Sequence, residues 1–169
     1  LQKMKAGGIT VISCYIIWIY HEEKEGEFCF DGNRNLREFI QIASKCGLKV
    51  IIRIGPWVHG EVRNGGFPDW LLNKNMKLRE DDPEYLQYVK IFYQAIYEQV
   101  QPYLFANNGP IWGIQLENEL TDQAGHLLTL RRLAEEIGLK APVYTVTGWN
   151  SKYGAQIPEY DVLPVFGGY

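Results

Sequence analysis

The fold of this chain is decided by one stretch, Ile111-Trp112-Gly113-Ile114-Gln115-Leu116-Glu117-Asn118-Glu119. It begins as an apolar run of strand-like length, directly after Asn108-Gly109-Pro110, and it ends in two carboxylates that flank a carboxamide. A carboxylate that is removed from water is costly unless it is paired or hydrogen-bonded. We therefore interpret this strand as one that carries chemistry at its carboxyl end, and we assign that chemistry to Glu119. For Glu117 we favour a structural role, as a helix cap or as the partner of an arginine.

Strand-like and helix-like segments alternate along the rest of the chain. Runs rich in β-branched residues predict strands at residues 9–17, 49–54, 111–116, 143–147 and 162–166. Apolar residues at helical spacing predict helices at residues 36–46, 83–100 and 127–137, and residues 1–8 are typical of the end of a further helix. Asn35 followed by Glu38 resembles a capping box, and Asp82-Pro83 supplies an N-cap with proline in the first turn.

This alternation predicts a parallel sheet with right-handed crossovers, in either a doubly wound fold or a (β/α) barrel. No G-x-G-x-x-G or P-loop motif follows any strand, which disfavours nucleotide-binding forms of the doubly wound fold. The polar residues fall after strands, as in barrel enzymes. These groups are Trp18-His21-Glu22, His59-Glu61, Asn118-Glu119 and Trp149-Asn150. We therefore predict an α/β fold of the (β/α)8 TIM-barrel type, incomplete in this chain, because a full barrel has eight strands and about 250 residues.

The composition excludes several classes of function. The chain has 169 residues, a formal net charge of −3 and no basic run, so a nucleic-acid partner is not expected. Its longest apolar run, Val11–Tyr20, is shorter than the ~20 residues of a membrane-spanning helix, so no membrane partner is expected. The cysteines are Cys14, Cys29 and Cys46; no C-x-x-C spacing occurs, so we expect free thiols and no zinc.

Three motifs in this order resemble the family 35 glycoside hydrolases, the β-galactosidase group. They are W-x-x-H-E…G-x-F-x-F-x-G at residues 18–32, R-x-G-P-W…E…G-G-F-P-x-W-L at residues 53–71, and G-P-I…Q-L-E-N-E at residues 109–119. The resemblance covers nearly the whole chain. The sequence departs from the family pattern at several positions: Ile17, Glu23 and Ile54 replace prolines, and Trp57 and Leu120 replace tyrosines. These departures bear on the sugar more than on the reaction.

The resemblance implies that residues 1–169 are part of a TIM-barrel catalytic domain, covering about strands 2 to 6. It implies a retaining exo-glycosidase that hydrolyses terminal non-reducing β-D-galactosyl residues of a β-galactoside or oligosaccharide, with no metal and no cofactor. Glu119 would be the catalytic acid/base and Asn118 would bind the sugar 2-hydroxyl. Tyr15, Gly60 and Glu61 would complete the substrate-binding set. The family's nucleophile, a second glutamate, would lie beyond Tyr169, so we expect this part alone to be inactive.

The individual residues also have simpler interpretations. Glu61 could be a solvated charge near Arg63, and without the resemblance Tyr15 would be assigned to the core. We hypothesise that Glu117 pairs with Arg53 on the preceding strand. We interpret Trp112 as a packing residue.

Other residues and other functions remain open at this stage. Trp149-Asn150 follows a strand, and we expect it to line the pocket. His21-Glu22 and His59 could suggest a metal site, but histidines in separate loops more often make hydrogen bonds. Two alternative functions are a catalytically silent carbohydrate-binding relative and a different barrel enzyme, such as an aldolase or a metal hydrolase. A related β-glycosidase with another sugar preference is a further possibility. The compartment and the oligomeric state are left open.

Overall fold

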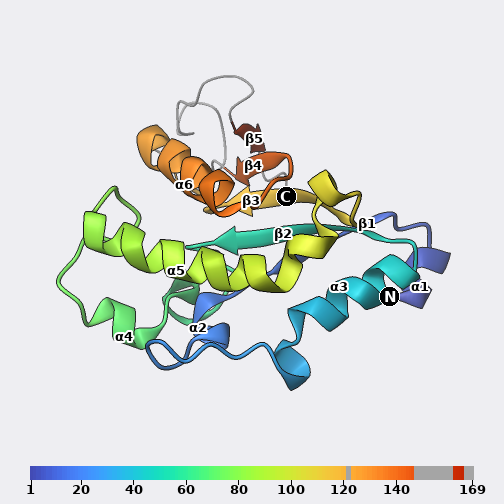
Figure 1. The fold of residues 1–169 in the computed structure, drawn as a ribbon, viewed down its shortest axis with the longest axis horizontal. Coiled ribbons are helices and arrows are strands. Elements are labelled where there is room, and N and C mark those ends of the chain that lie inside the picture. Colours follow the sequence, from blue (N-terminus) through green and yellow to red (C-terminus); the bar gives the residue numbers. More distant parts are fainter. Residues whose placement is uncertain (121–122, 147–161, 166–169) are drawn as a thin grey trace.

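The computed structural model describes residues 1–120, 123–146 and 162–165, and its centre is one sheet of five parallel strands (Figure 1). The strands are β1 (Val11–Tyr15), β2 (Lys49–Gly55), β3 (Ile111–Leu116), β4 (Val143–Val146) and β5 (Leu163–Val165). They follow one another across the sheet in sequence order. A doubly wound sheet reverses its strand order at a switch point, whereas successive barrel strands do not. The observed order is therefore that of consecutive strands in a barrel.

The helices lie where the sequence predicted them, with two additional short helices, α2 (Trp18–His21) and α4 (Asp69–Leu72). The others are α1 (Gln2–Ala6), α3 (Leu36–Lys45), α5 (Pro83–Val100) and α6 (Ala124–Ile137), with short 3₁₀ turns at Gly32–Arg34, Arg63–Gly66, Gln101–Tyr103 and Phe105–Asn107. The short helices α2 and α4 and the turn at Arg63–Gly66 lie in segments that the sequence predicted to be irregular. A helix of four residues is too short to show a periodicity in the sequence.

The predicted helix caps are confirmed. The side chain of Asn35 accepts a hydrogen bond from the backbone N–H of Glu38 at 2.9 Å. The side chain of Asp82 accepts from the backbone N–H groups of Glu84 and Tyr85 at 2.9 and 3.2 Å. These bonds satisfy donors that the first turn of a helix leaves free. They fix where α3 and α5 begin.

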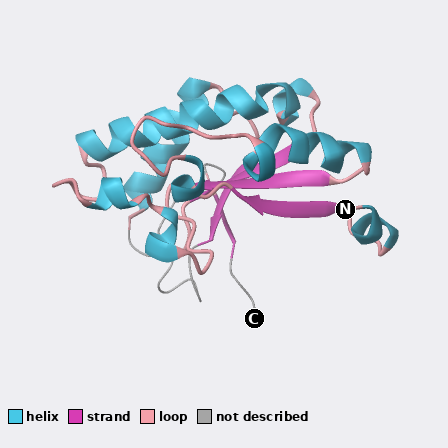
Figure 2. Ribbon diagram, turned by 90° about the horizontal axis from the view of Figure 1, so that it is seen from below, coloured by secondary structure: helices cyan, strands magenta, loops and turns pink. Residues whose placement is uncertain are grey.

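The two faces of the sheet are covered differently. On β2, the side chains of Val50, Ile52 and Ile54 are fully buried under α3 and α5, and Figure 2 shows these helices gathered on one side of the strands. The opposite face is more open. Trp112, which we interpreted as a packing residue, is 47% exposed, with Nζ of Lys49 4.8 Å from its ring centroid. Strand pairing explains this, because Ile111 and Gly113 pair with consecutive residues of β2 and leave Trp112 at the register shift.

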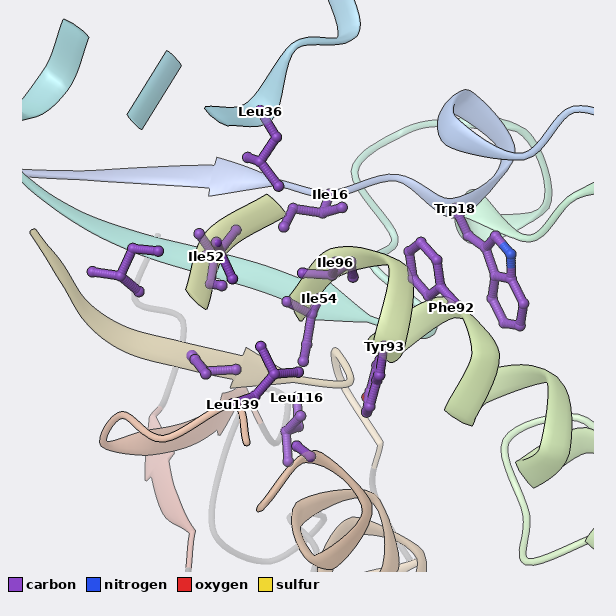
Figure 3. Close-up of a cluster of buried hydrophobic side chains, with 14 of the residues drawn as sticks. Ile16, Trp18, Leu36, Ile52, Ile54, Phe92, Tyr93, Ile96, Leu116 and Leu139 are labelled. Carbon is purple, nitrogen blue, oxygen red and sulfur yellow. The ribbon is translucent and has the colours of Figure 1, made fainter. Parts of the chain in front are cut away.

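An aromatic stack holds α5 against the segment that follows β1 (Figure 3). The rings of Trp18 and Phe92 are parallel, with centroids 4.6 Å apart, and both side chains are fully buried. Phe67, from the long segment after β2, meets Trp18 edge-on at 6.2 Å. Aromatic pairs of these geometries add to the stabilisation that comes from burial alone. The cluster thus joins three segments that are distant in the sequence.

We expect Phe92→Ala to lower the free energy of unfolding by about 3–5 kcal/mol, because it removes a fully buried ring and leaves a cavity beside Trp18. Urea unfolding followed by circular dichroism measures the change. Ile91→Ala is the matched control, since Ile91 lies on the same helix and is 43% exposed; its cost should be about 1 kcal/mol or less. Equal costs for the two variants would contradict the role assigned to the stack.

Candidate active site

The chain makes an unusual turn directly after β3. Glu117 and Glu119 have φ angles of 54° and 53°, in the left-handed region that residues with a side chain rarely adopt. The backbone N–H of Glu117 donates to the carbonyl of Gly55 at the end of β2, at 2.8 Å. The N–H of Glu119 donates to the carbonyl of Val146 at the end of β4, at 2.7 Å. The turn at residues 117–119, called the β3 turn below, is therefore tied to both neighbouring strands.

The side chain of Asn118 is buried and its orientation is fixed by two donors. Its Oδ1 accepts from Nη2 of Arg53 at 2.5 Å and from Nε2 of Gln115 at 3.0 Å. Gln115 also donates to the backbone carbonyl of Glu117 at 2.8 Å. A guanidinium can only donate hydrogen bonds, so the atom that it meets must be the amide oxygen. Within the described residues the NH₂ group of Asn118 makes no hydrogen bond.

Tyr15 and Gly60 lie beside this network. The guanidinium carbon of Arg53 is 3.9 Å from the centroid of the Tyr15 ring. A Cβ placed on Gly60 would lie 3.4 Å from Cε1 of the same ring, so the glycine backbone packs close to it. Tyr15 is 40% exposed, so it is not a core residue. The structure thus links Tyr15 and Gly60 to Asn118 through Arg53.

Glu119 lies next to a histidine that the sequence-based assignment left out. Its Oε2 is 3.5 Å from Nδ1 of His59, and the two side chains are 28% and 51% exposed, respectively. The His59 ring meets Trp57 edge-on, with centroids 5.7 Å apart. Trp57, His59 and Gly60 all belong to the loop after β2, so this loop reaches the β3 turn. The signal for His59 in the sequence was its place among the polar residues that follow the second strand.

Glu61 is the one predicted site residue that the structure does not join to the others. Its side chain is exposed and its φ angle is 50°. Within residues 1–120, 123–146 and 162–165 it makes no hydrogen bond or ion pair. Arg63, which the sequence suggested as a neighbour, instead pairs with Asp69 at 2.7 Å. Glu61 therefore remains free to meet a ligand from the same loop as Gly60.

The hypothesised pair between Arg53 and Glu117 is wrong, because the partner of Glu117 is Arg79. Nε and Nη2 of Arg79 donate to Oε2 of Glu117 at 3.0 and 2.7 Å. Nη2 also donates to the backbone carbonyl of Asn118 at 2.9 Å. The left-handed conformation of Glu117 interrupts the alternation of the strand and turns its side chain away from Arg53. Arg79 comes from an irregular segment, where no pattern in the sequence could identify it.

The Glu117 carboxylate is fully buried on the α5 side of the sheet. Burial raises the pKa of Glu117 above its usual value, while the Arg79 guanidinium opposes this shift. Burial also raises the pKa of Tyr85 and Tyr93 on α5, and the negative charge of Glu117 adds to both shifts. A buried carboxylate of this kind is costly without its cation. The structural role predicted for Glu117 is therefore confirmed, with a different arginine.

The segment that carries Arg79 is anchored to two helices. Asp81 accepts from Thr129 of α6 at 2.8 Å and contacts Nδ1 of His126, also on α6, at 2.7 Å. The next residue, Asp82, caps α5. These contacts hold residues 77–82 in place beneath the β3 turn.

The polar residues after β1 have a structural role. Nε1 of Trp18 donates to Glu22 at 2.6 Å, and Glu22 also accepts from the backbone N–H of Gly26 at 2.8 Å. Nδ1 of His21 contacts the carbonyl oxygen of Cys29 at 3.0 Å. Trp18, His21 and Glu22 are all buried. They close the loop on itself and contribute nothing to the β3 turn.

Some expectations concern metals, membranes and residues near the end of the chain. Among the described residues no group of three or more His, Cys, Asp or Glu side chains is placed to hold a metal ion, and the three cysteines are free thiols. Within the same part of the chain no helix is long and apolar enough to cross a membrane. Trp149-Asn150 lies outside the described residues.

Comparison with known proteins places this arrangement among glycosidases. The sequence model of the glycosyl hydrolases family 35 matches residues 1–165. The chain is 36% identical to the beta-galactosidase of Bos taurus over 158 residues, covering 90% of this chain and 24% of that protein. It is 35% identical to the exo-beta-D-glucosaminidase of Pyrococcus horikoshii over 141 residues, covering 70% of this chain and 18% of that protein. The chain thus spans about a quarter or less of these two relatives.

Solved structures show the same fold at low sequence identity. The crystal structure of a GH5_18 from Bifidobacterium longum subsp. infantis matches 90% of this chain and 39% of that chain, with a TM-score of 0.67 and 13% identity. The fold of the present chain is therefore part of a (β/α)8 barrel of the kind found in glycosidases, which confirms the predicted fold class. The β3 turn lies at the carboxyl ends of the strands, where barrel enzymes hold their active sites.

The contact of Asp81 with His126 makes the anchoring of Arg79 sensitive to pH. Burial lowers the pKa of His126 below its usual value of 6.5, against the attraction of Asp81. The unfolded chain therefore takes up a proton at a higher pH than the folded chain. The stability that neutral His126 contributes is present above the unfolded pKa and is lost as the pH falls through the folded pKa.

We expect His126→Gln to reduce the loss of folding stability at low pH, because glutamine can bond to Asp81 and does not titrate. Urea unfolding at about pH 7.5 and about pH 5.5 measures the effect, since these values bracket an ordinary histidine pKa. The free energy of unfolding of the parent should fall more between the two values than that of the variant. An equal fall in both proteins would show that His126 is not responsible.

Proposed function

Because this chain belongs to the glycosyl hydrolases family 35, we propose that it is part of the catalytic barrel of a retaining exo-β-galactosidase. The observation that carries this proposal is the β3 turn. It holds a carboxamide and a carboxylate side by side at the carboxyl end of a barrel strand, with the Asn118 amide bonded to Arg53 and Gln115 and the Glu119 backbone bonded to Val146. The substrate class is a terminal β-D-galactosyl residue of an oligosaccharide or glycoside.

Glu119 is the acid/base of the proposed reaction. It protonates the glycosidic oxygen as the bond to the anomeric carbon breaks, and it later takes a proton from the water that attacks the same carbon. A second carboxylate, supplied by a part of the polypeptide outside these residues, forms the intervening covalent bond to the sugar. Retaining glycosidases place these two carboxyl groups ~5–5.5 Å apart. Glu119 suits this role because its side chain is only partly exposed and its backbone is held by Val146.

The surroundings of Glu119 suit a sugar ring. Asn118 presents its NH₂ group, which donates a hydrogen bond to the sugar 2-hydroxyl. The half-exposed ring of Tyr15 beside the bare backbone of Gly60 gives a flat wall for the apolar C–H face of the sugar. The exposed carboxylate of Glu61, on the same loop, accepts hydrogen bonds from further hydroxyls. These roles of Tyr15, Gly60, Glu61 and Asn118 are proposals that rest on geometry and on the family.

The network around Asn118 favours a neutral substituent at C2 of the sugar. The exo-beta-D-glucosaminidase from Pyrococcus horikoshii is similar in sequence to this chain, so an amino sugar is the main competing substrate. A 2-amino group is protonated near neutral pH. It would then meet the donor side of Asn118, with the Arg53 guanidinium directly behind the amide. A hydroxyl group can accept from the same NH₂ without this repulsion, so we propose a 2-hydroxy sugar as the substrate.

We expect Glu119→Gln, in the full-length protein that carries these residues, to lower kcat for aryl β-galactosides by about 100-fold to 10,000-fold, the usual contribution of a general acid/base. Circular dichroism should show an unchanged fold. Glu136→Gln is the matched control, because Glu136 is exposed and lies near the carboxyl end of α6, outside the β3 turn and the loop after β2. Near-normal turnover by Glu119→Gln would remove the assignment. Absence of activity in the parent protein would support the silent carbohydrate-binding alternative.

A second prediction concerns the C2 substituent. The parent protein should hydrolyse nitrophenyl β-galactoside with a kcat/KM at least about 100-fold above that for the matching 2-amino-2-deoxy-β-galactoside, because an ammonium group faces donors and a nearby positive charge. Arg53→Gln removes the charge and should narrow this ratio. A preference for the amino sugar in the parent protein would contradict the proposed role of the network.

A further inference from the structure

The β3 turn is held from two sides. On the inner side of the sheet, Arg53 and Gln115 bind the side chain of Asn118. On the outer side, Arg79 binds the carboxylate of Glu117 and the backbone carbonyl of Asn118. The inner contacts orient one amide group. The outer contacts reach the backbone, so they determine where the turn as a whole lies.

Two residues of the β3 turn are in the left-handed region, so the turn needs external support. Backbone conformations of this kind persist where the surrounding structure over-determines them. Arg79 supplies three hydrogen bonds to residues 117 and 118, more than any other single side chain within the described residues gives to the turn. Arg79 itself has a φ angle of 60°, so it is held in a similarly unfavourable conformation. The ion pair between Arg79 and the fully buried Glu117 thus joins two residues that both have unfavourable backbone conformations.

Arg79 also supports the loop that follows β2. Its guanidinium carbon lies 4.8 Å from the ring centroid of Trp57, and Trp57 in turn meets His59 edge-on. His59 is the residue next to the Glu119 carboxylate. One side chain therefore contacts both parts of the site, the β3 turn and the loop that carries His59 and Gly60. Its Nε and Nη2 are already bonded to the protein, which leaves these groups unable to bind a substrate.

We propose that Arg79, through its ion pair with Glu117, is a positioning residue that aims Glu119 at the substrate. The inference rests on the proposed function, since it assigns Arg79 a task only if Glu119 transfers protons. The anchoring of its segment by Asp81 and Asp82 makes the arginine a fixed support. Without Arg79, the buried Glu117 loses its cation and the turn can relax, which moves the Glu119 carboxyl away from the glycosidic oxygen.

The leaving-group dependence of kcat/KM tests this proposal in the full-length protein. Dinitrophenol leaves without much help from an acid, whereas an alkyl or sugar alcohol needs the proton. We expect Arg79→Gln to lower kcat/KM for methyl β-galactoside or lactose by about 100-fold, the scale of a small displacement of a catalytic group. The fall for dinitrophenyl β-galactoside should be less than about tenfold, because proton donation matters less there. An equal fall for both classes of substrate would overturn the proposal.

A double-mutant cycle separates this proposal from the function on which it rests. If Arg79 acts through Glu119, adding Arg79→Gln to Glu119→Gln should cost little more than Glu119→Gln alone. If the double variant loses activity by the product of the two single fold-changes, the role of Arg79 is overturned and the proposed function is unaffected. Full activity of Glu119→Gln alone would overturn the proposed function itself.

Two further variants keep the test decisive if Arg79→Gln fails to fold. Arg79→Lys keeps the charge but not the paired geometry of the guanidinium, and Glu117→Gln removes the partner's charge. For both variants kcat/KM should again fall more for methyl β-galactoside or lactose than for dinitrophenyl β-galactoside, with smaller falls than in Arg79→Gln. If neither variant lowers kcat/KM for either class of substrate, the proposal is overturned. Lys77→Gln is the matched control, because Lys77 lies in the same segment, its side chain is 76% exposed and its ion pair is with Glu80. Lys77→Gln should leave kcat/KM unchanged for both classes of substrate.

Discussion

The arrangement of residues at the carboxyl end of the sheet depends on a three-residue turn, the β3 turn, that is unfavourable by itself. Glu117 and Glu119 occupy the left-handed region, and the cost of this conformation is offset by hydrogen bonds to Gly55 on one neighbouring strand and to Val146 on the other. The turn can exist only because both strands end at the same level. Parallel pairing in sequence order is what places them there. The position of the turn is thus set by the sheet.

The sheet in turn depends on an aromatic core that lies on one side of it. Trp18 and Phe92 stack below the strands, and the hydroxyl of Tyr93 donates to the carbonyl of Gly55 at 2.9 Å. Gly55 therefore receives one hydrogen bond from the core and one from Glu117. This shared acceptor connects the packing of α5 directly to the β3 turn. The ion pair of Arg79 with the fully buried Glu117 lies at the same junction.

Polar residues after the strands fall into two classes that the sequence does not separate. Asn118 and Glu119 follow β3 and lie at the open end of the sheet. His21 and Glu22 follow β1 in a similar position along the chain, yet their side chains bind their own loop. Both groups belong to motifs that resemble the same family. A motif thus does not separate residues that bind their own loop from residues that lie at the carboxyl end of the sheet, and the structure does.

The sequence by itself determined the alternation of strands and helices, the caps at Asn35 and Asp82, and the position of Glu119 at a strand end. These features follow from periodicity and from local hydrogen bonding, which depend on neighbouring residues. Only the tertiary structure decided the partners. Arg53 binds Asn118, Arg79 binds Glu117, and His59 approaches Glu119. A left-handed residue after β3 reverses the side-chain alternation, and an irregular segment brings in Arg79 from 38 positions away, so neither contact leaves a local pattern in the sequence.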